Sequence, residues 1–230
     1  MNELLFGSAY FSVALTLIAY SIGAVIQKKR NSPFCNPILI GTILVVLVLK
    51  YSDIPAAVYQ KNCAVLSHLM TPATICLSIA CYEQFRELKE HITAVIVSVL
   101  AGAVSCLAMV FLMCRAFKLD HVLTISLLPK SITSAIGVAI SEELGGIGAI
   151  TTAAIILSGI IGNVLGPWLC KLYGLRSDIA KGAAFGTASH VIGTAKATEL
   201  SALTGAVSSF SLTVCGLFTA LILSFFSQFL

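Results

Sequence analysis

Charged side chains are scarce in this chain of 230 residues. Only 10% of the residues are Asp, Glu, Lys or Arg, whereas a soluble domain has about 25%. Hydrophobic residues make up 58% of the sequence, and the mean hydropathy is +0.99. This balance excludes a soluble globular protein and indicates an integral membrane protein surrounded by the lipid bilayer. The net charge of +4 includes no basic cluster longer than Lys28-Lys29-Arg30, so nucleic-acid binding is not expected.

The chain also lacks the short motifs of metal sites, nucleotide sites and hydrolases. Its eight cysteines fall mostly within apolar runs and show no C-x-x-C or Cys/His spacing, so we interpret them as small core residues. Neither H-E-x-x-H nor a Walker-type glycine loop is present. Ser189 and His190 are adjacent, so they face different sides of a helix and cannot pair as nucleophile and base. We therefore expect no enzymatic activity, no cofactor and no metal.

Long apolar stretches alternate with short polar segments along the whole sequence. The stretches cover residues 4–26, 36–49, 63–82, 92–114, 121–140, 147–170, 183–199 and 205–230. We expect a single all-α transmembrane domain over residues 1–230, with about seven to eight membrane segments. A polar loop is expected at residues 50–62 and a charged amphipathic link at 83–91.

Three of the apolar stretches contain residues that interrupt helices, at Pro72, Pro129 and Gly193. Proline inside a helix removes a hydrogen bond and clashes with the preceding turn, and Gly193 allows the stretch at 183–199 to unwind locally. We expect broken or re-entrant helices near these positions, as in many transporters. A short similarity between residues 71–74 and 133–135 suggests an internal inverted repeat.

The positive charges suggest a topology. They follow the first apolar run instead of preceding it, which favours a retained span with the N-terminus outside. If every segment crossed fully, Lys171, Arg176 and Lys181 would also lie outside. A Pro129 segment that enters and leaves on the same face brings these three to the inside. We prefer this second arrangement.

Polar side chains cluster in three apolar regions and make up a candidate binding site for a small anion. Lys130 and Lys196 supply positive charge beside hydroxyl groups and free helix N-termini, which suits an anion. If the last region is helical, Thr187, His190 and Thr194 share a face, and His190 would assist the anion or carry a proton. The predicted substrate-binding residues are Thr71, Pro72, Thr74, Lys130, Ser131, Thr133, Ser134, Thr187, Ser189, His190, Gly193, Thr194 and Lys196.

Each of these residues also has a structural interpretation. Membrane Ser and Thr hydroxyls often bond to their own backbone. Lys196 is three residues before Glu199 and can form an ion pair with it or reach the interface. His190 can be a packed histidine with its hydrogen bonds satisfied. The functional interpretation therefore depends on the clustering, and it predicts that Lys196→Met abolishes uptake of the substrate.

Three segments closely resemble the LrgB/CidB family. They are LLPKSITSAIGVAISEELGGIGAIT at 127–151, GPWL at 166–169 and GTASHVIGTAKATEL at 186–200. The early Asn36-Pro37 and the Pro72 element match as well, so the resemblance covers essentially the whole chain. This sequence departs from the family at Thr71, where Gly is usual, at Ser134, where Pro is usual, and at Lys196, where Arg is usual. Lys196 keeps the positive charge of the usual Arg, but it cannot form the two parallel hydrogen bonds that a guanidinium group makes to a carboxylate.

The resemblance implies two alternative functions. Proteins similar to this family look like carriers of small monocarboxylates such as pyruvate or glycolate. The cationic and hydroxyl-bearing residues of the predicted site favour this function. The alternative is a holin/antiholin-like regulator of murein hydrolase activity and cell lysis. Either function implies a bacterial cytoplasmic (inner) membrane, an LrgA/CidA-type membrane partner and a homo-oligomer.

Overall fold

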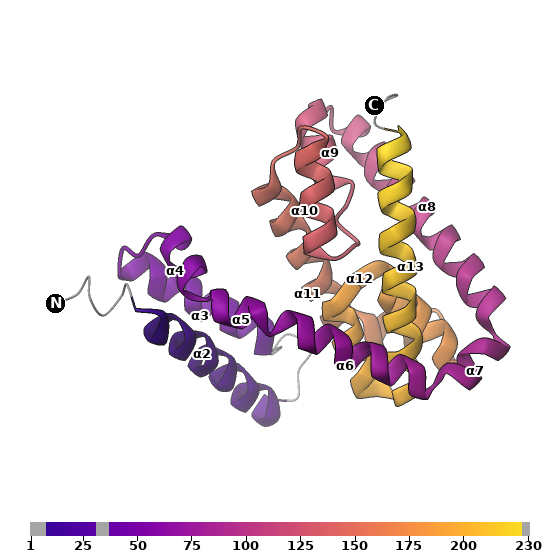
Figure 1. The fold of residues 1–230 in the computed structure, drawn as a ribbon, viewed down its shortest axis with the longest axis horizontal. Coiled ribbons are helices and arrows are strands. Elements are labelled where there is room, and N and C mark those ends of the chain that lie inside the picture. The colour runs from indigo at the N-terminus through magenta and orange to yellow at the C-terminus, as the bar shows by residue number, and fades with distance from the viewer. Residues whose placement is uncertain (1–7, 31–36, 227–230) are drawn as a thin grey trace. The chain divides into compact units, whose positions relative to one another are not determined.

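The computed structural model describes residues 8–30 and 37–226, and over these residues it contains twelve helices and no strand. The helices are α2 (Ala9–Arg30), α3 (Pro37–Tyr51), α4 (Ala56–Asn62), α5 (Ala64–His68), α6 (Met70–Glu83), α7 (Phe85–Glu90), α8 (Ile92–Ala116), α9 (His121–Leu127), α10 (Ser134–Glu143), α11 (Gly148–Leu172), α12 (Asp178–Leu200) and α13 (Ala202–Phe226) (Figure 1). The all-α prediction is confirmed. The chain divides into two compact units, Met1–Cys76 and Leu77–Leu230, which are described separately.

The N-terminal unit is built on a close pair of helices, α2 and α3. A Cβ on Gly23 would lie 2.7 Å from the Pro37 carbonyl oxygen, so glycine is what allows this approach. The predicted polar loop at 50–62 is wrong in part, because it contains α4. That helix is tied to α2 by a 2.6 Å hydrogen bond between the hydroxyls of Tyr59 and Thr16.

The predicted break near Pro72 is confirmed. Helix α5 ends at His68 and α6 begins at Met70. Pro72 lies in the first turn of α6, where the missing backbone N–H removes no helical hydrogen bond. The interruption therefore falls just before the proline.

Four helices in the described part of the chain are long and apolar enough to cross a membrane: α2, α8, α11 and α13. Helix α3 is a shorter apolar helix of 15 residues. The chain is thus a membrane protein, while the count of seven to eight segments and the internal repeat remain predictions.

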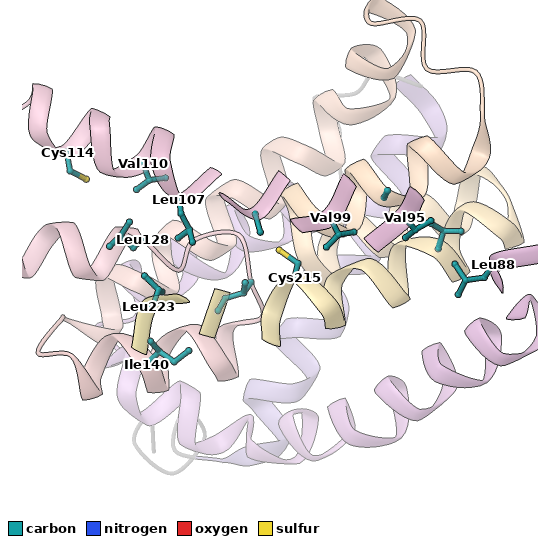
Figure 2. Close-up of a cluster of buried hydrophobic side chains, with 14 residues drawn as sticks. Leu88, Val95, Val99, Leu107, Val110, Cys114, Leu128, Ile140, Cys215 and Leu223 are labelled. Atoms are coloured by element: carbon teal, nitrogen blue, oxygen red, sulfur yellow. The ribbon is translucent and has the colours of Figure 1, made fainter. Parts of the chain in front are cut away.

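The core of the C-terminal unit lies between α8 and α13 (Figure 2). Val95, Val99 and Leu107 follow one another along a single face of α8 and are buried, at the spacing expected of a helix stripe. Cys215 and Leu223 of α13 belong to the same cluster. Because lipid tails are as apolar as these side chains, close packing and dispersion hold the helices together here.

Helices α9 and α10 form a helical hairpin beside α11. Ser126 in α9 accepts a hydrogen bond from the backbone N–H of Ile147, just before α11 begins. Ser158, near the middle of α11, donates to the carbonyl oxygen of Lys130 at 2.7 Å. Helix α10 then returns, and the Ser141 hydroxyl accepts from Thr151 near the start of α11. The predicted interruption at Pro129 is confirmed, since residues 128–133 separate the two helices.

Helix α12 is a second hairpin, so the broken helix predicted near Gly193 is confirmed. A straight helix of 23 residues would be roughly 35 Å long. Instead, the Ser201 hydroxyl, just past its end, donates to the Asp178 carboxylate at its start over 2.9 Å. The reversal occurs at His190, whose φ of 41° and ψ of −140° are not helical. The break therefore falls three residues before Gly193. Gly193 instead allows the two arms to meet, because a Cβ there would collide with Ser189.

The two hairpins enter from opposite ends of α11. The α9–α10 hairpin has its open end near Ile147, whereas the arms of α12 open at Asp178, a few residues beyond the other end of α11. The tips reach the same part of α11, where Ser158 contacts Lys130 and the Ile155 carbonyl contacts His190. This opposed arrangement brings polar side chains of both hairpins to the same level along α11.

The fold-back of α12 makes a prediction about cross-linking. The variant Asp178→Cys/Ser201→Cys should be joined within one chain by a short bismaleimide, because the native side chains are in hydrogen-bond contact. The matched control pairs Asp178→Cys with Val191→Cys at the tip of the hairpin, which the length of the first arm places roughly 18 Å away. Peptide mass spectrometry, with each single variant as background for the native cysteines, measures the product. An absence of the cross-link in the test pair, at the same background as the control pair, would contradict the hairpin.

Candidate functional site

An ammonium group without an acidic partner lies at the tip of the first hairpin. Lys130 is half-buried, and its Nζ donates to Ser131 Oγ at 3.5 Å and to Cys106 Sγ of α8 at 3.7 Å. Ser131 and Cys106 are themselves 2.9 Å apart. Among the described residues, the ion pairs are Lys181–Asp178 and Lys196–Glu199, so no carboxylate neutralises Lys130. A lone charge in apolar surroundings is costly, and an anion would offset that cost.

Two hollows meet at Lys130. The larger, about 880 Å³, lies between α8 and the first arm of α12. The smaller, about 430 Å³, lies between α11 and the same arm. Both extend from Lys130 to Leu175, in the loop that joins α11 to α12. A small ligand at Lys130 is therefore reached from the end of the unit where the second hairpin opens.

Residues of the second hairpin line these hollows. Thr187 lines the larger one and Ser189 the smaller, together with Ser158 of α11. The Thr187 hydroxyl donates to the Ala183 carbonyl of its own helix. The α12 arm lies close to α8, since a Cβ on Gly102 would be 2.9 Å from the Thr187 methyl group. The structure thus brings together four of the predicted site residues: Lys130, Ser131, Thr187 and Ser189.

His190 and Thr194 hold the tip of the second hairpin and do not line either hollow. His190 Nε2 lies 2.8 Å from the Ile155 carbonyl oxygen, and because a carbonyl can only accept, Nε2 carries the proton. The Thr194 hydroxyl donates to the His190 carbonyl at 2.9 Å and is 2.8 Å from the Ser208 hydroxyl of α13. These contacts satisfy backbone and side-chain groups at the break, as a membrane interior requires.

The remaining predicted residues lie elsewhere. Lys196 forms a 2.7 Å ion pair with Glu199, which matches its structural interpretation. Thr133 and Ser134 begin α10 and, like Gly193 and Lys196, do not line the hollows. Pro72 is exposed in the N-terminal unit. The side chains of Thr71 and Thr74 lie outside the described part of the structure.

Three residues with contacts at the hairpin tips were not predicted from the sequence. Cys106 contacts Lys130 and Ser131, Ser158 holds the Lys130 carbonyl, and the Asn163 amide donates to the Ile192 carbonyl at 2.9 Å. Asn163 is an amide within an apolar span, which is a usable signal. Cys106 carries no such signal, because a cysteine in an apolar run is usually a packing residue.

Two opposed hairpins, with one unneutralised cation at their tips, define a polytopic membrane protein with a polar site deep in its helix bundle. The LrgB-like family profile matches residues 16–229, and the chain belongs to this family. It is 35% identical over 223 residues to the holin-like protein CidB of Staphylococcus epidermidis, covering 97% of this chain and 96% of the relative. It is 34% identical to CidB of Staphylococcus aureus, with the same coverage. The antiholin-like protein LrgB of Bacillus cereus is 32% identical, over 96% of each chain. No solved structure matches this chain.

The geometry at Cys106 predicts a thiol that reagents in water can reach. A negatively charged methanethiosulfonate should label Cys106, because this side chain lines the larger hollow and the nearby Lys130 ammonium group attracts an anionic reagent. Cys114 and Cys215 are buried and serve as internal controls that stay unlabelled. Lys130→Met should slow the labelling of Cys106. Peptide mass spectrometry over a time course measures both effects. Labelling by an apolar maleimide alone would show that the hollow excludes water.

Proposed function

We propose that this protein is a carrier of small monocarboxylates, such as pyruvate or glycolate, and that Lys130 binds the carboxylate. The observation that supports this most strongly is the position of Lys130, which has no acidic partner among the described residues and lies where both hollows end. Ser131 Oγ accepts from this ammonium group at 3.5 Å, and Thr187 and Ser189 line the hollows that it faces. This combination is typical of a weak, reversible site for a small organic anion.

The charge balance favours one negative charge on the substrate. Within the described residues, Lys130 is the only lysine or arginine that lines either hollow. A dicarboxylate would leave its second charge without a lysine or arginine partner, which is costly in a membrane. The small side chains at Ala184 and Ala188 leave room for a short body beside the carboxylate.

The hollows also favour access from one side at a time. They run toward the end that carries Lys171, Arg176 and Lys181, a basic segment that would attract anions. Beyond Lys130 the first hairpin is packed, with Ile125, Leu128 and Ile132 of the turn region buried. A site at the tips of two helical hairpins that is open to one side fits alternating access in transporters. We further propose a location in the bacterial cytoplasmic membrane, a homo-oligomeric state and an LrgA/CidA-type partner.

Uptake of labelled pyruvate into proteoliposomes, with and without the partner protein, tests this function. We expect saturable uptake that Lys130→Met lowers at least about tenfold, since a charge-assisted hydrogen bond is lost. Lys196→Met is the matched control and should retain most of the uptake, because that ammonium group is paired with Glu199. Equal loss in both variants would mean that Lys130 has no special role. An absence of saturable flux in every condition would refute the carrier.

The names of the relatives favour a second candidate function. Proteins about a third identical to this chain are called holin-like and antiholin-like, so this chain would regulate murein hydrolase activity and lysis. A lesion-forming protein would release an encapsulated dye from the same proteoliposomes without saturation, whereas a carrier retains the dye. Dye release together with unsaturable pyruvate flux would support this second function.

A further inference from the structure

A line of buried polar side chains runs along α13 where it faces the two arms of α12. Thr204, Ser208, Ser211, Cys215 and Thr219 are at most 3% exposed and recur at helical spacing on one face. Most of them have partners, such as the Thr194 hydroxyl for Ser208. Ser211 Oγ is different, because it is the one buried side-chain oxygen or nitrogen in the described chain that has no hydrogen-bond partner. Such a group normally indicates an unseen ligand or water.

The surface that Ser211 faces is the backbone near the end of the first α12 arm. A Cβ on Gly186 would lie 2.8 Å from Ser211 Cβ, so nothing but backbone separates the two elements there. One turn further along α13, Cys215 Sγ lies 3.8 Å from the Thr187 carbonyl oxygen. The arm ends just beyond, because His190 leaves the helical conformation. Carbonyl oxygens in the last turn of a helix lack helical donors, and the Thr187 carbonyl lies in this last turn, one turn of α13 from Ser211.

We propose that Ser211 Oγ and carbonyl oxygens of this last turn, including that of Thr187, bind a sodium ion. Oxygen ligands suit a hard cation, and the C-terminal end of a helix carries partial negative charge. No group of three acidic, histidine or cysteine side chains suited to a metal occurs in the described part of the chain, which disfavours a divalent ion. Ends of half-helices and unwound carbonyls are the usual sodium ligands in transporters.

The position of this site explains how the ion would act on the carrier proposed above, on which this step depends. Thr187 connects the two sites, since its carbonyl faces α13 while the residue lines the larger hollow with Lys130. A sodium ion there would fix the end of the arm and order the wall of the hollow. Sodium should therefore raise the affinity for the carboxylate, and the carboxylate should raise the affinity for sodium to the same extent.

Sodium binding can be measured without transport. The purified full-length protein is heated in NaCl, KCl or choline chloride at equal ionic strength, and binding of radioactive sodium is followed in parallel. We expect NaCl alone to raise the Tm of the wild-type protein, because a ligand specific to the folded state stabilises it. Ser211→Ala should weaken the apparent sodium affinity at least about tenfold. Ser209→Ala is the matched control, since Ser209 already donates to the Gly205 carbonyl of its own helix, and it should respond like the wild type.

The outcomes separate the site from the proposed function. Equal Tm values in NaCl and choline chloride, without bound radioactive sodium in the wild type, would overturn the site even if Ser211→Ala did not fold. An unchanged sodium response in Ser211→Ala would also overturn it. Sodium binding without pyruvate uptake would uphold the site and refute the carrier. Sodium-independent uptake without sodium binding would uphold the carrier and refute the site.

Discussion

A backbone interrupted inside a membrane must find hydrogen-bond partners within the protein, and α11 provides them for both hairpins. Ser158 donates to the Lys130 carbonyl, the Ile155 carbonyl accepts from His190, and Asn163 donates to the Ile192 carbonyl. Lipid offers no replacement for these bonds. Glycine makes the contacts possible, because a Cβ at Gly159 would lie 2.6 Å from the His190 ring. The depth and the position of each tip therefore depend on α11.

Because both tips depend on the same helix, they also lie next to each other. Lys130 arrives from one end of the bundle and the Thr187–His190 segment from the other, so neither hairpin has to cross the whole unit. The half-buried Lys130 ammonium group and the two hollows beside it follow from the proximity of the two tips.

The sequence predicted the first hairpin well and the second only in part, for a physical reason. Proline and lysine in an apolar run make Pro129 a visible interruption, and the structure breaks the helix there. Nothing comparable marks His190, because a positive φ in a residue other than glycine is locally unfavourable and must be imposed by tertiary contacts. Gly193 indicated the correct region, but its role in the structure is to allow the two arms of α12 to pack closely against each other. Cys106 and Ser158 became site residues only through long-range packing, which no local pattern encodes.

The two candidate functions make different demands on the same fold. A protein that opens lesions by assembly needs adhesive outer helix faces, and the outer face of α8 offers apolar side chains such as Val97, Val104 and Leu112. It has no need for two helix breaks with individually bonded carbonyls, or for an ammonium group held at the depth of those breaks. Such features are costly in a membrane and are usually associated with binding and movement of a polar solute. The proposed carrier function therefore explains the two helix breaks and the buried ammonium group, which a lesion-forming function does not. Under this proposal, an influence on lysis would be a consequence of the solute that the carrier moves.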